Sequence, residues 1–401
     1  MKQALKFYKN LTLLAIIGVP IGIVTGMLAV VFGKTLIKIT DIRSTSPIYF
    51  LPFLPIIGLF IVYIYKKFGG KSIKGMSLIF EVAQQKEDKI PLRLIPLVIF
   101  TTWLTHLFGG SAGREGVAVQ IGATFSNWVY DKLKIKNCGK TFLIIGMASG
   151  FSGLFQTPVS AIFFAIEVLI AGAIHYSALI PAITASFAAS ATSHFLGLEK
   201  FTFNLSYNIN IDFLIVFKLI ILGILFGIVG SLFALCLKYF KQMFKTKIPS
   251  DTKRIFIISI FLSVFLLLLH NGRYSGLGTN LINLSFNGNG IYFYDWLLKF
   301  LFTAITLSIG FQGGEVTPLF SIGASLGAVL ATFFNLPIEL VASLGYISVF
   351  GSATNTFFAP IFIGGEVFGY EYMPFYFIVM SFAYIFNFNK SIYSLQQNSQ
   401  F

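Results

Sequence analysis

Long runs of apolar residues recur along almost the whole chain. Four of these runs cover residues 11–32, 50–65, 213–237 and 255–269. Their lengths are near the roughly 20 residues with which a helix crosses the hydrocarbon of a bilayer. The chain is 56% hydrophobic and only 11% charged, more apolar surface than a soluble core can use. The pattern predicts an all-α integral membrane protein, and the first run is a retained helix rather than a cleaved signal because further spans follow it.

Other apolar segments are short and interrupted by glycine or proline, at residues 109–116, 146–158, 310–318 and 351–360. A non-helical backbone survives at membrane depth only where protein or a wet cavity satisfies its polar groups. We therefore expect broken helices that line a polar site.

The interruptions belong to an internal repeat. Gly75 and Gly276 open similar segments, as do Gly113 and Gly314, and both pairs are 201 residues apart. We predict two transmembrane repeats, residues 11–200 and 201–401, after a short amino-terminal segment of residues 1–10. Paired interrupted segments indicate a transport site at the repeat interface; ordinary packing of small residues is the alternative.

The basic residues lie in short loops between apolar runs. Examples are Lys66, Lys67, Lys71 and Lys74. This distribution is the bias of cytoplasmic loops, so the net charge of +14 does not indicate a nucleic-acid partner. We expect the amino terminus to be cytoplasmic.

Cysteine and histidine residues do not form a recognisable ligand pattern. Cys138 and Cys236 are far apart in sequence, and the four histidines are scattered. We expect neither a disulfide nor a metal site, and no cofactor.

The glycine-rich segments open helices, and helix amino termini carry roughly half a positive charge. Several such termini aimed at one point would bind an anion. Arg114 and Glu115 stand in one of these segments, and ionisable residues at membrane depth are functional hypotheses by default. A carboxylate there could occupy the anion site when ionised and leave it when protonated. A structural ion pair between Arg114 and Glu115 is the alternative.

The run Gly-Arg-Glu-Gly-Val-Ala-Val-Gln-Ile-Gly at residues 113–122 resembles the signature of the CLC anion channels and transporters. Residues 75–79 and 314–318 stand where that family has its first and second anion-contacting turns. Residues 389–394 resemble its carboxy-terminal helix, which offers a tyrosine hydroxyl to the anion. The resemblance covers essentially the whole chain and implies the CLC-type fold of two inverted-topology repeats with broken helices.

The resemblance also assigns residues. It implies a gating and proton-coupling role for Glu115, and we add Glu315 as a second proton-coupling group. The expected anion-binding residues are Gly75, Met76, Ser77, Gly113, Arg114, Gly116, Val316, Thr317 and Tyr393.

Three departures from the chloride-type pattern favour the fluoride/proton antiporter branch of the family. Met76 stands where chloride-selective members generally have serine, and a thioether has no strong donor to hold chloride; a core-filling methionine is the alternative. Val168 stands at the inner glutamate of chloride/proton exchangers. Glu315 and Thr317 replace apolar side chains. Glu167, next to Val168, is interpreted as a structural carboxylate, as are Glu81 and Glu366.

The predicted function is proton-coupled fluoride export that confers fluoride resistance. A chloride channel or chloride/proton exchanger is the alternative, and an intramembrane enzyme that uses Glu115 and His106 has little support. The predicted partners are fluoride, or chloride in the alternative, protons and membrane lipid. We expect a homodimer in a bacterial inner or plasma membrane, with no carboxy-terminal regulatory domain. Apolar helices such as residues 158–170 and 375–386 could supply the dimer interface.

Overall fold

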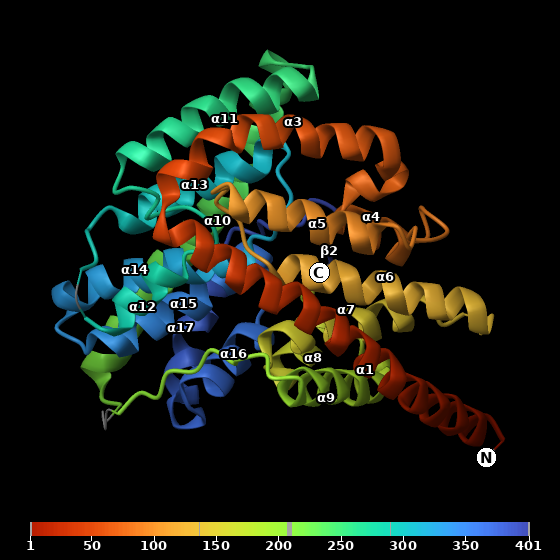
Figure 1. The fold of residues 1–401 in the computed structure, drawn as a ribbon. Helices are drawn as coiled ribbons and strands as arrows, with labels where there is room; N and C mark the ends of the chain where they lie inside the picture. The colour runs from red at the N-terminus through yellow and green to blue at the C-terminus, as the bar shows by residue number, and fades with distance from the viewer. Residues whose placement is uncertain (1, 136, 207–210, 289, 400–401) are drawn as a thin grey trace.

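The protein is described by a computed structural model that covers residues 2–135, 137–206, 211–288 and 290–399. Helices dominate these residues (Figure 1). The first half contains α1 (Lys2–Thr45), α2 (Pro47–Phe50), η1 (Leu51–Phe53), α3 (Leu54–Ile64), η2 (Tyr65–Gly69), η3 (Gly70–Lys74), α4 (Met76–Ala83), α5 (Leu94–Leu107), α6 (Glu115–Leu133), α7 (Gly139–Phe155), α8 (Pro158–Glu167), η4 (Tyr176–Ala178) and α9 (Leu179–Phe195).

The second half repeats the order of the long helices. It contains α10 (Phe213–Lys247), α11 (Asp251–Leu268), α12 (Thr279–Phe286), α13 (Asp295–Ile309), α14 (Val316–Phe334), α15 (Ile338–Thr354), α16 (Phe358–Phe368), η5 (Tyr370–Tyr372) and α17 (Met373–Ile385). The helices α6 and α14 begin 201 residues apart and have equal lengths of 19 residues. The spacing read from the glycine motifs is therefore the spacing of whole helices.

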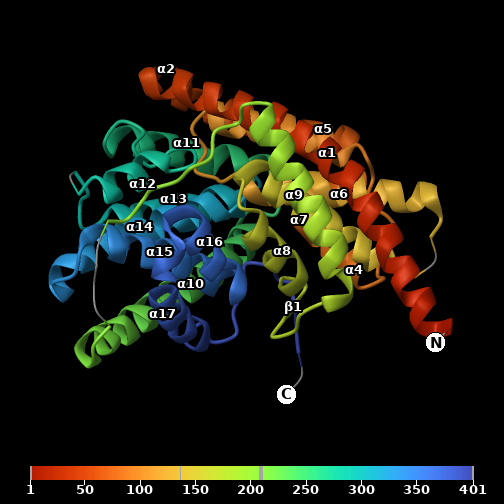
Figure 2. The ribbon, with the colours of Figure 1, turned by 90° about the horizontal axis from the view of Figure 1, so that it is seen from below.

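Within the described residues, four helical stretches are long and apolar enough to cross a bilayer: Tyr8–Thr45, Pro47–Ala83, Phe213–Lys247 and Val316–Phe334. Shorter apolar helices such as α8 and α16 fill the space between them. In Figure 2, α1 and α9 run beside each other. The one sheet among the described residues is minimal, because β1 (Ile170–Ala171) pairs in parallel with β2 (Gln397–Asn398).

Small residues set the closest helix contacts. A Cβ on Gly122 would lie 2.1 Å from the carbonyl oxygen of Gly146, and a Cβ on Gly323 would lie 2.0 Å from that of Gly345. The pairs α6–α7 and α14–α15 therefore pack backbone to backbone, as small residues permit between membrane helices. Most of the predicted interruption at residues 146–158 is consequently helical, and the break itself is confined to Gln156 and Thr157 between α7 and α8.

Two glutamates join the halves by capping each other's helix. Glu167, the last residue of α8, accepts the backbone N–H groups of Phe357, Phe358 and Ala359 at the start of α16, at 2.8–3.1 Å. Glu366, near the end of α16, accepts the N–H groups of Val159 and Ser160 at the start of α8, at 3.0 and 2.9 Å. Carboxylates satisfy the otherwise unpaired donors of a helix amino terminus. The structural interpretation of Glu167 and Glu366 agrees with these contacts.

Candidate functional site

The segments that lead into α6 and α14 meet through Gly113 and Gly314. The N–H of Gly314 donates to the carbonyl of Gly113 at 2.8 Å, and the N–H of Gly113 donates back to the carbonyl of Gly314. The two residues form an antiparallel bridge. A Cβ on Gly113 would lie 2.7 Å from Cδ of Pro318 and 2.9 Å from the Gly314 carbonyl, so glycine is required for this approach. Two helix termini of opposite halves are thereby directed at one region.

Glu115 is the first residue of α6, and its side chain is fully buried. Its Oε2 accepts the backbone N–H of Thr317 at 3.1 Å and also a short hydrogen bond from the Thr317 hydroxyl. Arg114 lies beside it, with Nε 3.4 Å from Oε1. The carboxylate therefore sits at the amino terminus of α14, where the helix dipole favours negative charge. This arrangement also contains the Arg114–Glu115 ion pair that the sequence left as an alternative.

A cavity of about 650 Å³ opens beside this junction. It brings together six of the predicted site residues, namely Gly75, Met76, Ser77, Gly116, Glu315 and Tyr393. The other predicted residues, Gly113, Arg114, Glu115, Val316 and Thr317, do not line it and belong to the bridge between α6 and α14. Gly116 belongs to both groups, because a Cβ there would lie 3.4 Å from Cα of Gly314. The predicted site is thus two adjoining parts, a buried junction and an open cavity.

Gly75 precedes α4 with a φ of +52°, a left-handed conformation that favours glycine. The turn places Met76 as the first residue of α4 and brings Gly75 close to Gln120 of α6. The side-chain oxygen of Gln120 is buried without a hydrogen-bond partner. The sequence interpretation used Gln120 only as part of the family signature at residues 113–122, and its position one turn after Gly116 is the signal that would have placed it in the site.

Glu315 is the residue immediately before α14; its side chain makes no capping hydrogen bond within the described structure, and it lines the cavity. Its Oε2 lies 3.7 Å from the place where a Gly116 side chain would begin. Among the described residues no lysine or arginine forms an ion pair with Glu315. Its half-buried side chain therefore borders the cavity beside the junction without a salt-bridge partner among the described residues.

Tyr393 lies in an irregular segment after α17, so the expectation of a carboxy-terminal helix at residues 389–394 is wrong. Hydrogen bonds hold the segment instead: Ile392 N–H donates to the Ala353 carbonyl at 2.9 Å, and Tyr393 N–H donates to Ser391 Oγ at 3.1 Å. The Tyr393 ring packs against Phe80, with centroids 5.4 Å apart. Its hydroxyl is buried and has no hydrogen-bond partner among the described residues. Buried polar groups are normally paired, so this hydroxyl is available to a ligand.

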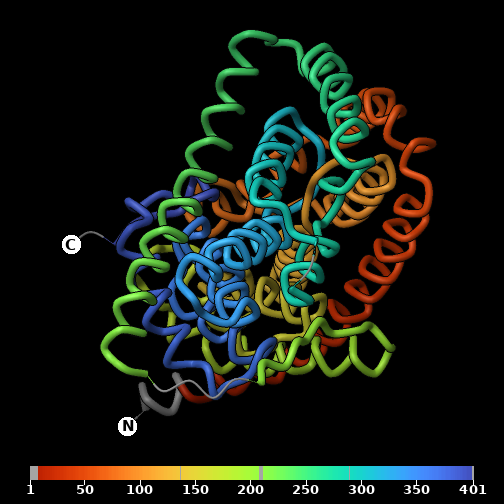
Figure 3. The backbone as a smooth tube through the Cα atoms, turned by 90° about the vertical axis from the view of Figure 1, so that its left-hand side faces the viewer, coloured from red at the N-terminus to blue at the C-terminus, as the bar shows by residue number. Residues whose placement is uncertain are grey.

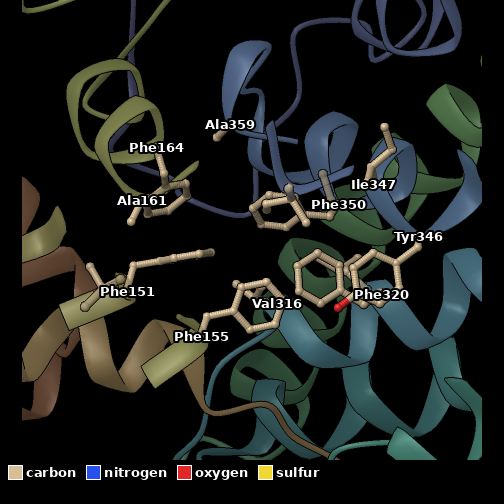
Figure 4. Close-up of a cluster of buried hydrophobic side chains, with 14 of the residues drawn as sticks. Phe151, Phe155, Ala161, Phe164, Val316, Phe320, Tyr346, Ile347, Phe350 and Ala359 are labelled. Atoms are coloured by element: carbon tan, nitrogen blue, oxygen red, sulfur yellow. The ribbon is translucent and has the colours of Figure 1, made fainter. Parts of the chain in front are cut away.

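Aromatic side chains gather around Val316, the first residue of α14 (Figure 4). Phe320 stacks on Tyr346 with centroids 4.0 Å apart and on Phe155 at 5.4 Å. Figure 4 places Val316 among these rings, so its side chain is a core contact and only its backbone is suited to bind an anion. The cluster belongs to the main hydrophobic core, so the start of α14 is packed directly against that core.

Val168 is the residue that the sequence analysis placed at the inner glutamate position of chloride/proton exchangers. Val168 is fully buried. Its neighbour Glu167 already accepts three backbone N–H groups. His106 is likewise engaged, with both ring nitrogens bonded to the carbonyls of Thr102 and Ala112 at 2.8 and 2.9 Å. Within the part of the chain that the structure describes, no cluster of histidine, cysteine or acidic residues could hold a metal.

Comparison with known proteins decides the family. The model of the voltage gated chloride channel family matches residues 57–387, most of the chain. The protein belongs to the voltage gated chloride channel (CLC) family. Its fold is thus the predicted all-α CLC fold of a multi-pass membrane protein.

Individual CLC proteins extend this comparison. The chain is 32% identical over 384 residues to the "Chloride/fluoride channel protein" of Pseudomonas syringae pv. tomato, covering 94% of this chain and 84% of the relative. It is 25% identical over 347 residues to the H(+)/Cl(-) exchange transporter ClcA of Yersinia pseudotuberculosis, covering 80% and 71%. A crystal structure of a CLC-type fluoride/proton antiporter matches with a TM-score of 0.96 at 52% identity, covering 98% of this chain and 99% of that one. A slow cyanobacterial Cl-/H+ antiporter shares the fold, with a TM-score of 0.80 at 18% identity over 93% and 94% of the two chains.

Proposed function

We propose that this protein is a fluoride/proton antiporter that exports fluoride from the cell in exchange for protons. The observation that carries the proposal is its likeness, over nearly the whole chain, to a CLC-type fluoride/proton antiporter. The side chains at the two predicted anion-contacting turns also support it. Met76 has no hydroxyl with which to hold chloride, and Glu315 and Thr317 are polar where chloride-type members have apolar side chains. Chloride/proton exchange is the second candidate, since the chain also resembles ClcA.

Glu115 acts as the gate in this proposal. When ionised, its carboxylate occupies the amino terminus of α14, held by the N–H and hydroxyl of Thr317. Protonation removes the charge that both donors and the helix terminus stabilise. The neutral side chain then leaves the position, and a fluoride ion takes the same donors. The ionised carboxylate and the fluoride ion thus compete for the same donors, and protonation of Glu115 decides which of them binds there, which couples proton movement to fluoride movement.

The cavity supplies a second anion position, at the level of Met76 and Tyr393. The unpartnered Tyr393 hydroxyl donates to the anion there, with the backbone at Gly75–Ser77 and Gly116 beside it. The backbone of Val316 and the hydroxyl of Thr317 serve the junction position. Gly113 and Arg114 shape the junction through the bridge to Gly314 and the contact with Glu115.

Glu315 carries protons between the cavity and the junction. It lines the cavity, lies beside Gly116, and has no cationic partner among the described residues. A capping role alone is served equally well by serine, threonine or asparagine, whereas a carboxylate at membrane depth is costly. Because Val168 has no titratable group, we assign to Glu315 the proton transfer that a second glutamate performs in chloride/proton exchangers.

The cavity opens to the cytoplasm. Lysines at the end of η3, along α10 and after α17 line it. Lys66 of η2, which precedes η3, donates to Thr252 at 3.0 Å, so the start of α11 lies beside this basic loop. Figures 1 and 2 show the amino terminus toward the same side as α4. By the excess of basic residues on cytoplasmic loops, this side and the amino terminus are cytoplasmic in the plasma membrane. The repeat boundaries at residue 200 and a homodimer formed through α8 and α17 complete the proposal.

The proposal is tested with purified protein in liposomes. Fluoride efflux, chloride efflux and proton uptake are measured in parallel with ion-selective electrodes and a pH probe. We expect fluoride efflux to drive proton uptake and to exceed chloride efflux. Equal or faster chloride movement would favour the chloride/proton exchanger, and ion flux without proton movement would favour a channel.

A further inference from the structure

The walls of the cavity carry one sign of charge. Lysines from three separate segments line it, namely Lys74, Lys238, Lys241, Lys245 and Lys390. Lys74 is neutralised, because its Nζ lies 2.7 Å from Glu81 and 3.1 Å from Glu87. Hydrogen bonds from Lys71 and from Lys74 lower the pKa of Glu87, so that carboxylate stays ionised in this network. The positive charge of Lys74 is therefore balanced by these two carboxylates and adds little to the charge of the cavity wall.

The other four ammonium groups are not neutralised. Among the described residues, none of Lys238, Lys241, Lys245 and Lys390 forms an ion pair with a carboxylate. Three of them follow the spacing i, i+3 and i+7 on α10 and therefore share one face of that helix. Figure 3 shows α10 as the long green helix along one edge of the molecule, beside the carboxy-terminal segment that contains Lys390. The face of α10 and this segment border the same cavity.

Glu315 is the acidic residue among the described residues that line the cavity. The four lysines are exposed, whereas Met76 and Glu315, which line the same cavity, are half-buried and Tyr393 is buried. A cleft lined by one sign of charge focuses the field and raises the local concentration of counter-ions, with on-rates rising by about 10- to 1,000-fold in favourable cases. Such a field attracts every small anion alike and discriminates by charge, not by size.

We propose that Lys238, Lys241, Lys245 and Lys390 form an anion capture site at the mouth of the cavity. The inference rests on the proposed function. The site concentrates small inorganic anions from the cytoplasm, and selection for fluoride takes place deeper, at the Met76 and Tyr393 level. A polyvalent anion such as inorganic pyrophosphate binds the capture site more tightly than fluoride because several ammonium groups contact it together, and it blocks access.

The alternative is that these lysines only orient α10 at the membrane surface, as basic residues on cytoplasmic loops generally do. The test compares two triple variants with the same change of charge. One carries Lys238→Gln, Lys241→Gln and Lys245→Gln. The control carries Lys67→Gln, Lys132→Gln and Lys134→Gln, three exposed lysines that do not line the cavity. Thermal unfolding of both variants checks that they fold.

Initial rates of fluoride efflux are measured as a function of fluoride concentration, and the series is repeated at several concentrations of an inert salt between about 10 and 300 mM. Over this range of salt the Debye length falls from about 30 Å to less than 8 Å. We expect the KM of the wild type to rise with salt and pyrophosphate to inhibit it competitively. The cavity variant has a KM about three- to tenfold higher at low salt with an unchanged kcat, little salt dependence, and no inhibition by pyrophosphate. The control variant behaves as the wild type.

Equal KM, salt dependence and pyrophosphate inhibition in the wild type and the cavity variant would overturn the capture site. An identical change in the control variant would also overturn it, because the effect would then be one of net charge. Failure of the wild type to exchange fluoride for protons would instead overturn the proposed function. In that case calorimetric titration of pyrophosphate into the detergent-solubilised wild type and cavity variant still decides the capture site: loss of binding in the variant supports it, and equal binding overturns it.

Discussion

The hydroxyl of Thr317 is expected to set how firmly the gate is held. Glu115 accepts two hydrogen bonds from Thr317, one from the backbone N–H at 3.1 Å and one from the hydroxyl. Thr317→Val removes the hydroxyl and keeps the backbone donor and the branched shape. A hydrogen bond to a charged group contributes about 1.5–3 kcal/mol, and about 1.4 kcal/mol corresponds to a factor of ten. The equilibrium between the held and the released carboxylate should therefore shift by about 10- to 100-fold toward release.

The assay is the number of protons moved per fluoride ion in liposomes, with Thr317→Ser as the matched control because it keeps the hydroxyl. A carboxylate that leaves without being protonated lets fluoride pass alone, so we expect Thr317→Val to move fewer protons per fluoride ion. Thr317→Ser should keep the wild-type ratio. An unchanged ratio and rate in Thr317→Val, or equal loss in both variants at equal thermal stability, would refute the assignment of the hydroxyl to the gate.

Four further changes test other parts of the site. Glu115→Gln cannot release a proton and should abolish proton movement driven by a fluoride gradient; proton flux at the wild-type rate would contradict the gating role. Met76→Ser places a hydroxyl donor at the start of α4 and should lower the ratio of fluoride to chloride efflux, whereas an unchanged ratio would place discrimination elsewhere. Glu315→Gln keeps hydrogen bonding without the titratable group and should stop or uncouple antiport in a folded protein; wild-type coupling would leave Glu315 only a helix cap. Glu167→Gln leaves buried N–H groups at the start of α16 without full acceptors and should lower the free energy of unfolding by about 2 kcal/mol, measured by denaturant unfolding, while the surface change Glu81→Gln should cost less than about 1 kcal/mol.

The class of the protein followed from the chain alone. Apolar runs near 20 residues, basic loops and glycine-interrupted segments depend on local composition, which the bilayer constrains strongly. The spacing of 201 residues between Gly113 and Gly314 predicted an internal repeat, and the structure joins these two residues in an antiparallel bridge. Short motifs were therefore sufficient to indicate the fold and the residues at its centre.

The arrangement of the site was decided by the tertiary structure. The sequence placed Tyr393 on a helix, yet long-range hydrogen bonds such as that from Ile392 to Ala353 hold it in an irregular segment. The division into a junction at Glu115 and a cavity at Glu315 depends on how α6 and α14 cross. The lysines of α10 face that cavity because α10 lies against the carboxy-terminal segment. Contacts between segments that are far apart in the sequence depend on packing geometry, which no local pattern encodes.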